Sequence, residues 1–579
     1  MSETATPDDA LAVAVAQDYH ERTKHRLNGY AAGPDTLDWE AQPDPFRRYP
    51  GAPLHSLPLT ADQLAIPWAD LFEPGRIAPR ALDRAAIGLL FELSFALSAW
   101  KQYGPDRWAM RVNPSSGNLH PTEAWLVCQG LEGIADGVHH YAAREHALEQ
   151  RAPFATPTDA HVTKTTARAF VALTSIHWRE AWKYGERAFR YCQLDVGHAI
   201  GTLRYAAAVL GWRLQPVAGS TAQLAALLGL DRDSDFAAAE REEPDALFEL
   251  LPHGMTTAND SPWNWPAPTH WQGVPNRLDR HPMYRWPVID AVSVATRVHD
   301  MPTEVPGSLG GRAFCAGKGG ARAAGGGHGA ERSATQTLPD LPRSTEPAAT
   351  LIRQRRSAQR FDARARMPLA QLWRLLRALH PARLPFDAGP AEPRVHVLLF
   401  AHRVDGLAPG AYLLPRSNAG HVLLRHSLPA ALDLSLVPDA PADAPLLRLA
   451  ENPALAATLR TLDCHQALGS DAILGFALLA EFNPLPDAAA YRQRLQEAGL
   501  IGQALYLEAE ALDLRGTGIG CFFDDALHQL IGLPEAGAAS ASLQSVYHFT
   551  IGVPVTDARI ATEPPYAHLL PDREGDDHG

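Results

Sequence analysis

The most informative stretch of this chain is Arg111-Val112-Asn113-Pro114-Ser115-Ser116-Gly117-Asn118-Leu119-His120-Pro121. Its two prolines and its glycine exclude a regular helix or strand, because proline lacks an amide donor and glycine favours unusual backbone angles. Its serines, asparagines and arginine carry the groups that hydrogen-bond a flat polar ring. An apolar run at helical spacing (residues 85–100) precedes the stretch, and a strand-like run (residues 123–128) follows it. This composition is typical either of a surface loop or of a cofactor-binding loop, and the rest of the chain favours the second.

The composition indicates a globular protein with more than one domain. The chain has 579 residues, of which 46% are hydrophobic and 20% are charged, and this length is too great for one core. The formal net charge of −13 argues against nucleic-acid or anionic-membrane partners, because either would require a basic face. No apolar run approaches the roughly 18 residues that span a bilayer, and no secretion signal is visible at the start. We therefore expect a cytoplasmic protein.

The cysteines and histidines indicate neither a disulfide framework nor a metal site. The cysteines are odd in number, scattered, and form no Cys-x-x-Cys pair; they are Cys128, Cys192, Cys315, Cys464 and Cys521. The 25 histidines likewise show no His-x-x-x-His spacing of the kind that binds zinc. No metal is predicted.

Changes in composition divide the chain into four segments. Residues 1–60 are polar and rich in proline and are predicted to form an arm, with one short helix, that packs over a neighbouring surface. Residues 61–300 and 346–579 are predicted to be two α+β domains. Between them, residues 301–345 are crowded with glycine and poor in large apolar groups, which predicts a flexible linker. Gly317-Lys318 within it does not complete a phosphate-binding loop, because position 319 is glycine.

Several local structures are predicted from periodicity. The run at 85–100 is expected to be helical, whereas residues 250–300, rich in tryptophan and proline, are expected to lack regular structure. Asp524 and Asp525 are expected to cap a following helix.

The chain contains an internal repeat. At one constant offset, Phe189-Arg190 matches Tyr491-Arg492, and Asp195-x-Gly197 matches Glu497-x-Gly499. In both copies an apolar strand-like run precedes the helix and a glycine- or proline-containing segment follows it. Two copies of one α+β unit predict an intramolecular pseudo-dimer, in which a ligand at the interface takes groups from both halves.

These features carry a resemblance to a known family. Arg355-Arg356-Ser357, the Pro114–Asn118 loop and Gly516-Thr-Gly-Ile-Gly520, in this order and in two halves, resemble the flavin-binding elements of the nitroreductase family. The stretches 19–25 and 178–198 more specifically resemble its SagB/ThcOx-type dehydrogenase branch, which includes azoline oxidases. The resemblance covers roughly residues 15–220 and 350–565. It implies tandem nitroreductase-like domains with non-covalent FMN between them.

The resemblance implies roles for three segments. Arg355, Arg356 and Ser357 would clamp the FMN phosphate, since guanidinium groups match phosphate oxygens and nearby helix amides could assist; the alternative is a solvated basic turn. From the first half, the flavin ring would be contacted by Arg111, Pro114, Ser115, Ser116 and Asn118. The equivalent loop of the second half, residues 384–390, lacks these groups, so one composite site is expected to survive.

Glycine-rich residues of the second half would lie against the flavin ring. They are Gly516, Gly518, Ile519 and Gly520. The resemblance implies that their backbone amides tune the reduced flavin. The alternative is a simple helix stop.

Lys183 and Tyr184 are the candidate catalytic residues. A Lys-Tyr pair at the equivalent place in azoline oxidases is the base and its partner, and a buried lysine can accept a proton near neutral pH. The alternative is the start of an amphipathic helix with its lysine in water.

Together these observations predict an FMN-dependent oxidoreductase that oxidises azolines to azoles in a small-molecule or peptide substrate, with O2 as electron acceptor. Two alternatives remain open. One is an NAD(P)H-dependent nitro or quinone reductase, and the other is a flavin- or peptide-binding protein without turnover.

Overall fold

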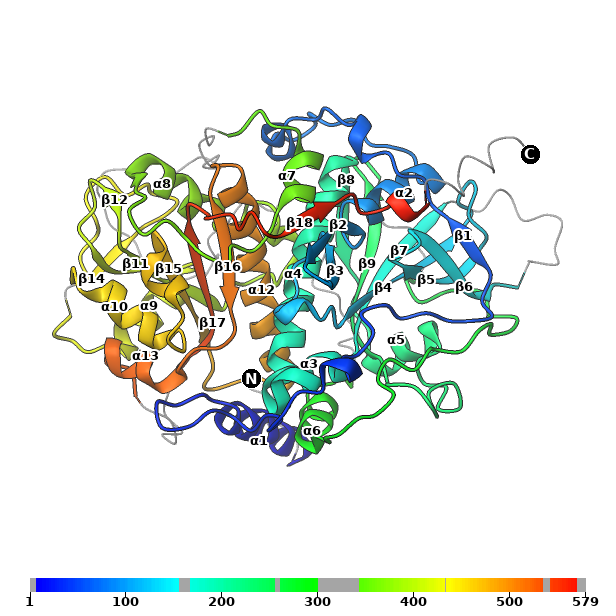
Figure 1. The fold of residues 1–579 in the computed structure, drawn as a ribbon, viewed down its shortest axis with the longest axis horizontal. Helices are drawn as coiled ribbons and strands as arrows, with labels where there is room; N and C mark the ends of the chain where they lie inside the picture. The colour runs from blue at the N-terminus through cyan, green and yellow to red at the C-terminus, as the bar shows by residue number, and fades with distance from the viewer. Residues whose placement is uncertain are drawn as a thin grey trace, which may run out of the picture.

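The computed structural model describes residues 7–155, 167–255, 261–299, 343–432, 434–534 and 542–569. The predicted linker at 301–345 lies almost wholly outside these residues. The described chain contains two large antiparallel sheets, one on each side of a central pair of helices (Figure 1).

The first sheet has seven strands in the order β1-β6-β5-β4-β7-β9-β8, and every neighbouring pair is antiparallel. Its strands in chain order are β1 (Leu54–Ser56), β4 (Thr122–Gln129), β5 (Gly137–Ala142), β6 (Ala147–Pro153), β7 (Arg168–Ser175), β8 (Trp212–Pro216) and β9 (Glu243–Pro252). We call this sheet and the helices around it the first unit.

The second sheet has six strands in the order β14-β13-β11-β15-β17-β16, again antiparallel throughout. Its strands are β11 (Val395–Ala401), β13 (Gly410–Leu414), β14 (Leu447–Glu451), β15 (Leu474–Glu481), β16 (Arg515–Ile519) and β17 (Leu543–Gly552). We call this sheet and its helices the second unit. Five strands in each sheet follow the same chain order and the same spatial order, β5-β4-β7-β9-β8 and β13-β11-β15-β17-β16. The predicted tandem repeat is therefore confirmed.

Two helices of 22 residues, α4 (Ala188–Val209) and α12 (Ala489–Glu510), are the repeated central element. They lie side by side between the sheets (Figure 1). Every residue of α4 is buried, as expected for a helix covered on all sides. A Cβ atom at Gly197 would overlap the Gln496 carbonyl, and one at Gly499 would overlap the Leu194 carbonyl. Because these contacts are reciprocal, the two units are related by an approximate two-fold axis at this crossing.

Shorter elements surround this core. The remaining helices are α1 (Pro7–Arg22), α2 (Arg84–Glu92), α3 (His177–Tyr184), α5 (Thr221–Leu228), α6 (Pro287–Ala295), α7 (Ala348–Gln354), α8 (Leu369–Ala378), α9 (Asn418–Ser427), α10 (Leu455–Leu462), α11 (Ala467–Asp471) and α13 (Asp524–Ile531). The remaining strands are β2 (Leu97–Tyr103), β3 (Asp106–Arg111), β10 (Met367–Pro368), β12 (Val404–Asp405) and β18 (Ala561–Glu563).

Segments from both chain ends tie the units together. β18, from the C-terminal part, pairs with β2 of the first unit (Figure 1). Beyond it, the Tyr566 hydroxyl accepts from the Leu97 amide at 2.9 Å and donates to the Ala143 carbonyl at 2.7 Å. From the N-terminal arm, His20 of α1 contacts the Tyr491 hydroxyl of α12 at 3.3 Å.

Three local predictions are wrong. The helix expected over 85–100 ends at Glu92, and residues 97–103 instead form β2, because pairing with β3 and β18 outweighs the local helical spacing. Residues 250–300 contain the helix α6, whose first residue is a proline that helical geometry tolerates at this position. The predicted cap is also wrong, because the residue that precedes α13 as its N-cap is Phe523, and Asp524 is the first residue of the helix. The Asp524 carboxylate forms ion pairs with Arg187 and Arg190.

Enlarging Gly499 should weaken the association of the two units. In Gly499→Ala, the added methyl group overlaps the Leu194 carbonyl and lies 3.0 Å from the Gly197 Cα. Forcing the helices apart should cost about 1–3 kcal/mol, typical of overpacking. We expect a lower thermal midpoint by differential scanning fluorimetry, whereas Gly29→Ala, where no atom lies within 4 Å of the new methyl, should leave it unchanged. Equal midpoints for the two variants would contradict the close crossing.

Candidate functional site

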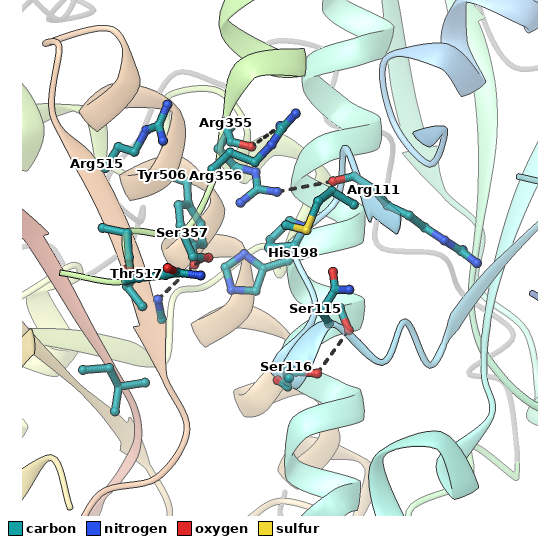
Figure 2. A pocket seen from close by; sticks show the side chains of 18 of the residues that line it. Arg111, Ser115, Ser116, His198, Arg355, Arg356, Ser357, Tyr506, Arg515 and Thr517 are labelled. Atoms are coloured by element: carbon teal, nitrogen blue, oxygen red, sulfur yellow. Dashed lines mark hydrogen bonds between the residues drawn. The ribbon is translucent and has the colours of Figure 1, made fainter. Parts of the chain in front are cut away.

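A cavity of about 490 Å³ lies at the junction of the two units. The first unit contributes residues of β2, β3, α4 and the 113–118 loop, and the second contributes residues of the 355–359 segment, α12, β16 and β17. Figure 2 shows these groups around a common space. The structure thus brings together, from distant parts of the chain, most of the residues predicted to bind a cofactor.

The 113–118 loop is held by a carboxylate behind it. Asp195 of α4 accepts hydrogen bonds from the Ser116 amide at 3.0 Å and the Ser116 hydroxyl at 2.9 Å. The Asn118 side chain donates to the Ala109 carbonyl at 2.9 Å, and Ser115 accepts from the His120 amide at 2.7 Å. The polar side chains of this loop therefore fix its shape, and its outer face borders the cavity.

Gly117 permits this shape and a close contact with Tyr184. Its φ is +59°, in the left-handed region that favours glycine. A Cβ atom there would lie 3.1 Å from a Tyr184 ring carbon. The loop and the C-terminal end of α3 are therefore packed directly against each other.

Arg355 fastens the second unit to this loop. Its Nε donates to the Val112 carbonyl at 3.3 Å and its Nη2 to the Arg111 carbonyl at 3.4 Å, while its guanidinium lies 5.0 Å from the Tyr506 ring centre. Arg111 itself turns its guanidinium away from the cavity to bind the Pro45 carbonyl, so only its main chain faces Arg355 (Figure 2).

Arg356 and Ser357 complete the predicted clamp. Arg356 donates to the carbonyls of Ser98 at 3.0 Å and of Arg353 at 2.8 Å, and Ser357 is exposed, with its hydroxyl 2.7 Å from that of Tyr506. The clamp follows the C-terminal end of α7. The prediction that nearby helix amides assist the clamp is therefore wrong for α7, because the free amides of a helix lie at its N-terminus.

Positive charge accumulates at this end of the cavity. Burial, followed by repulsion from Arg355 and Arg515, lowers the pKa of Arg356 to about 9. Burial and the charges of Arg356 and Arg515 also lower the pKa of Lys101. Lys101 and Arg515 line the cavity and were not identified from the sequence, because each is a single cation on an ordinary strand. Cations that depress one another's pKa favour binding of an anion.

The glycine-rich segment forms most of the strand β16 and is not a simple helix stop. Gly516, Gly518 and Ile519 belong to β16, and Gly518, Ile519 and Gly520 line the cavity, whereas Gly516 packs behind it against Phe549 and Tyr506. The amide of Gly518 donates to the Tyr506 hydroxyl at 3.0 Å. Side chains at Gly518 and Gly520 would overlap the rings of Tyr547 and Tyr191. The small residues thus keep this wall flat.

Of the two predicted catalytic residues, Tyr184 lines the cavity and Lys183 does not. Tyr184 lines the cavity, and burial, followed by the nearby Glu180 carboxylate, raises its pKa well above the usual value. Lys183 is not among the lining residues; its Nζ lies 5.7 Å from the Trp39 ring centre and 5.4 Å from that of Tyr184. Both residues end α3 rather than begin a helix.

Buried acids behind the cavity were not identified from the sequence as site residues. Burial raises the pKa of Asp195 to about 7, despite its hydrogen bonds from the 115–116 segment. Glu180 is fully buried, neither of its carboxylate oxygens hydrogen-bonds another described residue, and burial followed by the charge of Asp195 raises its pKa well above the usual value. Asp195 was visible in the sequence as a member of the repeat, but its position beneath the loop was not.

The symmetry-related position carries different residues. Arg204 of α4 occupies the place that Tyr506 occupies on α12, and it forms an ion pair at 2.7 Å with Asp387, which lies in the loop equivalent to the 113–118 loop. This pairing supports the expectation of one composite site.

The sequence matches the nitroreductase family over residues 104–239 and 352–552, which together make up more than half of the chain. This chain belongs to the nitroreductase family. A curated relative, a nitroreductase homologue of Methanocaldococcus jannaschii, is 29% identical over 135 residues, which cover 21% of this chain and 64% of the relative. The match therefore spans less than two thirds of that relative's length.

One solved structure shares this architecture along most of its length. A nitroreductase homologue from Anabaena variabilis is 21% identical, with a TM-score of 0.62, and covers 93% of this chain and 99% of its own. The tandem arrangement is thus shared along nearly the whole chain. A nitroreductase homologue from Exiguobacterium sibiricum, solved in complex with FMN, is 13% identical and covers 38% of this chain and 91% of its own, with a TM-score of 0.22. Within the described residues, none of the helices has the length and apolarity required to cross a bilayer.

The raised pKa of Asp195 predicts a pH-dependent stability. Between the ordinary value of about 4 and its folded value of about 7, the unfolded state ionises while the folded state keeps its proton. The free energy of unfolding therefore includes a contribution from protonated Asp195 that is fully present below pH 4. This contribution, at most roughly 4 kcal/mol, is lost as the pH rises to 7. We expect the thermal midpoint of Asp195→Asn, measured relative to that of the native chain, to increase as the pH rises from 5 to 8. The exposed-site variant Asp35→Asn should show a constant difference, and a constant difference for Asp195→Asn would contradict the assignment.

Proposed function

We propose that this chain is an FMN-dependent oxidoreductase with one non-covalent FMN in the cavity between the two units. The observation that carries the proposal is the cluster of Lys101, Arg356 and Arg515 at one end of a cavity that has the Gly518–Gly520 segment on one wall. Burial and then mutual repulsion lower the pKa of Arg356 and Lys101, and a phosphate group would relieve the repulsion.

The residues present fit the other parts of FMN. The ring would lie between the Pro114–Asn118 loop and the Gly518–Gly520 wall, where a side chain at either glycine would overlap a tyrosine ring. Ser357, which lines the cavity, would contact the phosphate or the ribityl chain, while Arg355 holds the two units in register. Bound FMN would supply hydride transfer.

We further propose that the substrate is an azoline in a small molecule or peptide, with O2 as final electron acceptor. Support comes from Tyr184, the phenol that reaches the cavity beside the 113–118 loop. Its raised pKa keeps its proton on the oxygen at neutral pH, so it orients the substrate as a donor. Lys183, which contacts the Tyr184 ring from outside the cavity, would act as the base only through Tyr184.

Removing one cation should weaken FMN binding selectively. Losing a charge-assisted contact to phosphate should raise the Kd of FMN about 10- to 100-fold in Arg515→Ala, equivalent to roughly 1.5–3 kcal/mol. Riboflavin, which lacks the phosphate, should bind the variant and the native chain equally. Arg107→Ala is the matched control. Arg107 lies on β3 and forms an exposed ion pair with Glu563, so its loss should leave the Kd of both ligands unchanged. Equal losses for the two ligands would mean that Arg515 does not bind the phosphate.

Anaerobic reduction tests the reaction. A thiazoline-containing peptide should bleach the visible absorbance of the FMN-loaded protein, whereas NADPH should not. Tyr184→Phe should slow bleaching at least tenfold without changing the Kd of FMN, because only the hydroxyl is lost. Rapid bleaching by NADPH would instead favour a nitro or quinone reductase, and no bleaching by either would favour a binding protein.

A further inference from the structure

Two cysteines lie in contact beside the cavity. Cys521, two residues after the end of β16, lines the cavity, and its Sγ lies 2.7 Å from the Sγ of Cys464, in the turn between α10 and α11. Both side chains are partly accessible. The other two cysteines in the described part of the chain, Cys128 and Cys192, are fully buried.

The contact is built into the fold. On one side of it, the Phe523 amide donates to the Leu462 carbonyl at 2.8 Å. On the other side, the Gln466 side chain donates to the Cys521 carbonyl at 3.3 Å. Cys464 also has a left-handed φ of +52°. The two cysteine segments, although distant in sequence, are therefore held together around the thiols.

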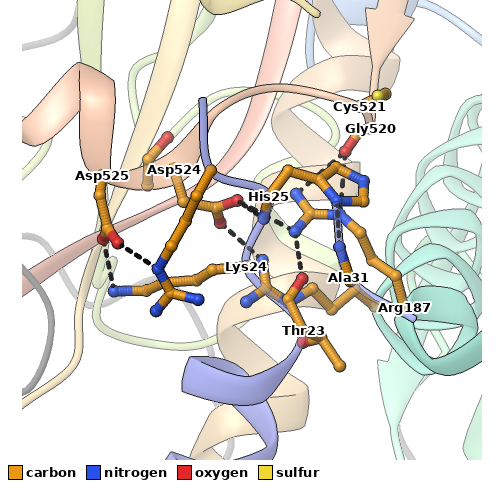
Figure 3. A network of polar contacts seen from close by, with 12 residues as sticks. Thr23, Lys24, His25, Ala31, Arg187, Gly520, Cys521, Asp524 and Asp525 are labelled. Carbon is orange, nitrogen blue, oxygen red and sulfur yellow. Dashed lines mark hydrogen bonds and ion pairs between the residues drawn. The ribbon is translucent and has the colours of Figure 1, made fainter. Parts of the chain in front are cut away.

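The N-terminal arm brings a histidine to Cys521 (Figure 3). The Nδ1 of His25 accepts a hydrogen bond from the Ala31 amide at 2.9 Å. The proton of the neutral imidazole is therefore on Nε2, and this N–H group faces the Cys521 sulfur. The His25 main chain is fixed by its amide, which donates to Asp524 at 2.9 Å. Arg187 donates to the Gly520 carbonyl at 3.0 Å and pairs with Asp524, so its positive charge lies beside the same thiol.

These neighbours favour the thiolate of Cys521. The contact with the Cys464 thiol is the largest influence, burial opposes it, and His25 then reinforces it, which together lower the pKa of Cys521. The pKa of Cys464 is raised correspondingly, because its proton is shared with Cys521. The remaining titratable groups that face the pair are Tyr30, Tyr184, Tyr191 and Asp463.

We propose that Cys521 and Cys464 form a thiol–disulfide exchange centre for small disulfides that enter the cavity. The Cys521 thiolate attacks one sulfur of the small disulfide, which breaks its S–S bond, forms a mixed disulfide and releases the first thiolate. Cys464 then loses its proton to the released thiolate and attacks the Cys521 sulfur, which releases the second thiolate. The pair is oxidised to a disulfide, and both electrons reside in the two released thiols. This activity does not depend on FMN.

Glutathione disulfide tests the exchange directly. In a Cys315→Ser background, which removes the cysteine outside the described residues, the chain should release two equivalents of glutathione. Peptide mass spectrometry should then find Cys464 linked to Cys521. Cys464→Ser should stop at a glutathione adduct on Cys521 with one equivalent released, and Cys521→Ser should react at least tenfold more slowly. Cys128→Ser should behave as the native chain.

A linked pair that does not form, or a Cys521→Ser variant that reacts as fast as the native chain, would overturn the proposal. Performing the reaction with and without added FMN separates this outcome from the proposed oxidoreductase, because the exchange should proceed in both.

The role of His25 has its own readout. The rate of Cys521 alkylation by iodoacetamide should rise with a midpoint well below the ordinary thiol value in the native chain and at a higher pH in His25→Gln. A midpoint near the ordinary thiol value of about 8.5 in both proteins would overturn the activation by His25.

Discussion

The close crossing of α4 and α12 is the constraint on which the rest of the structure depends. Gly197 and Gly499 each leave the space that a carbonyl of the opposite helix occupies. Glycine within a helix costs about 1 kcal/mol relative to alanine, so both positions give up helix stability in exchange for backbone contact. The contact sets the distance between the two sheets and thereby the width of the cavity.

The presence of both units in one chain allows the two halves to differ, because a substitution on α4 need not be matched on α12. Tyr506 on α12 presents its hydroxyl to Gly518 and Ser357, whereas Arg204 on α4 forms an ion pair with Asp387 at the related position. A homodimer built from one unit would carry both changes in both sites.

Burial governs the chemistry of the site. The cations at one end of the cavity repel one another, and the acids Asp195 and Glu180 behind the loop are held toward their neutral forms by desolvation. A low-dielectric pocket with like charges grouped in this way binds an oppositely charged group strongly. The thiol pair at Cys521 lies on the same wall, so the cavity combines a predicted flavin site with a second reactive group.

The sequence predicted the features that carry a local signature. The 113–118 loop was recognisable because prolines, glycine, serines and asparagines occur together, and the repeat was recognisable because identities on two helices share one offset. Lys101 and Arg515 carry no such signature, and Cys464 meets Cys521 only through tertiary packing. The strand β2 was misassigned because its apolar residues also occur at helical spacing, and its pairing with the neighbouring β3 and the distant β18 outweighs that local pattern.

The stoichiometry of FMN binding tests the central claim most directly. Titration calorimetry of the purified chain should give one FMN per chain, because the proposed site needs the 113–118 loop together with Lys101, Arg356 and Arg515, and the related position instead carries the Arg204–Asp387 ion pair. A stoichiometry of two, or no binding, would contradict the account.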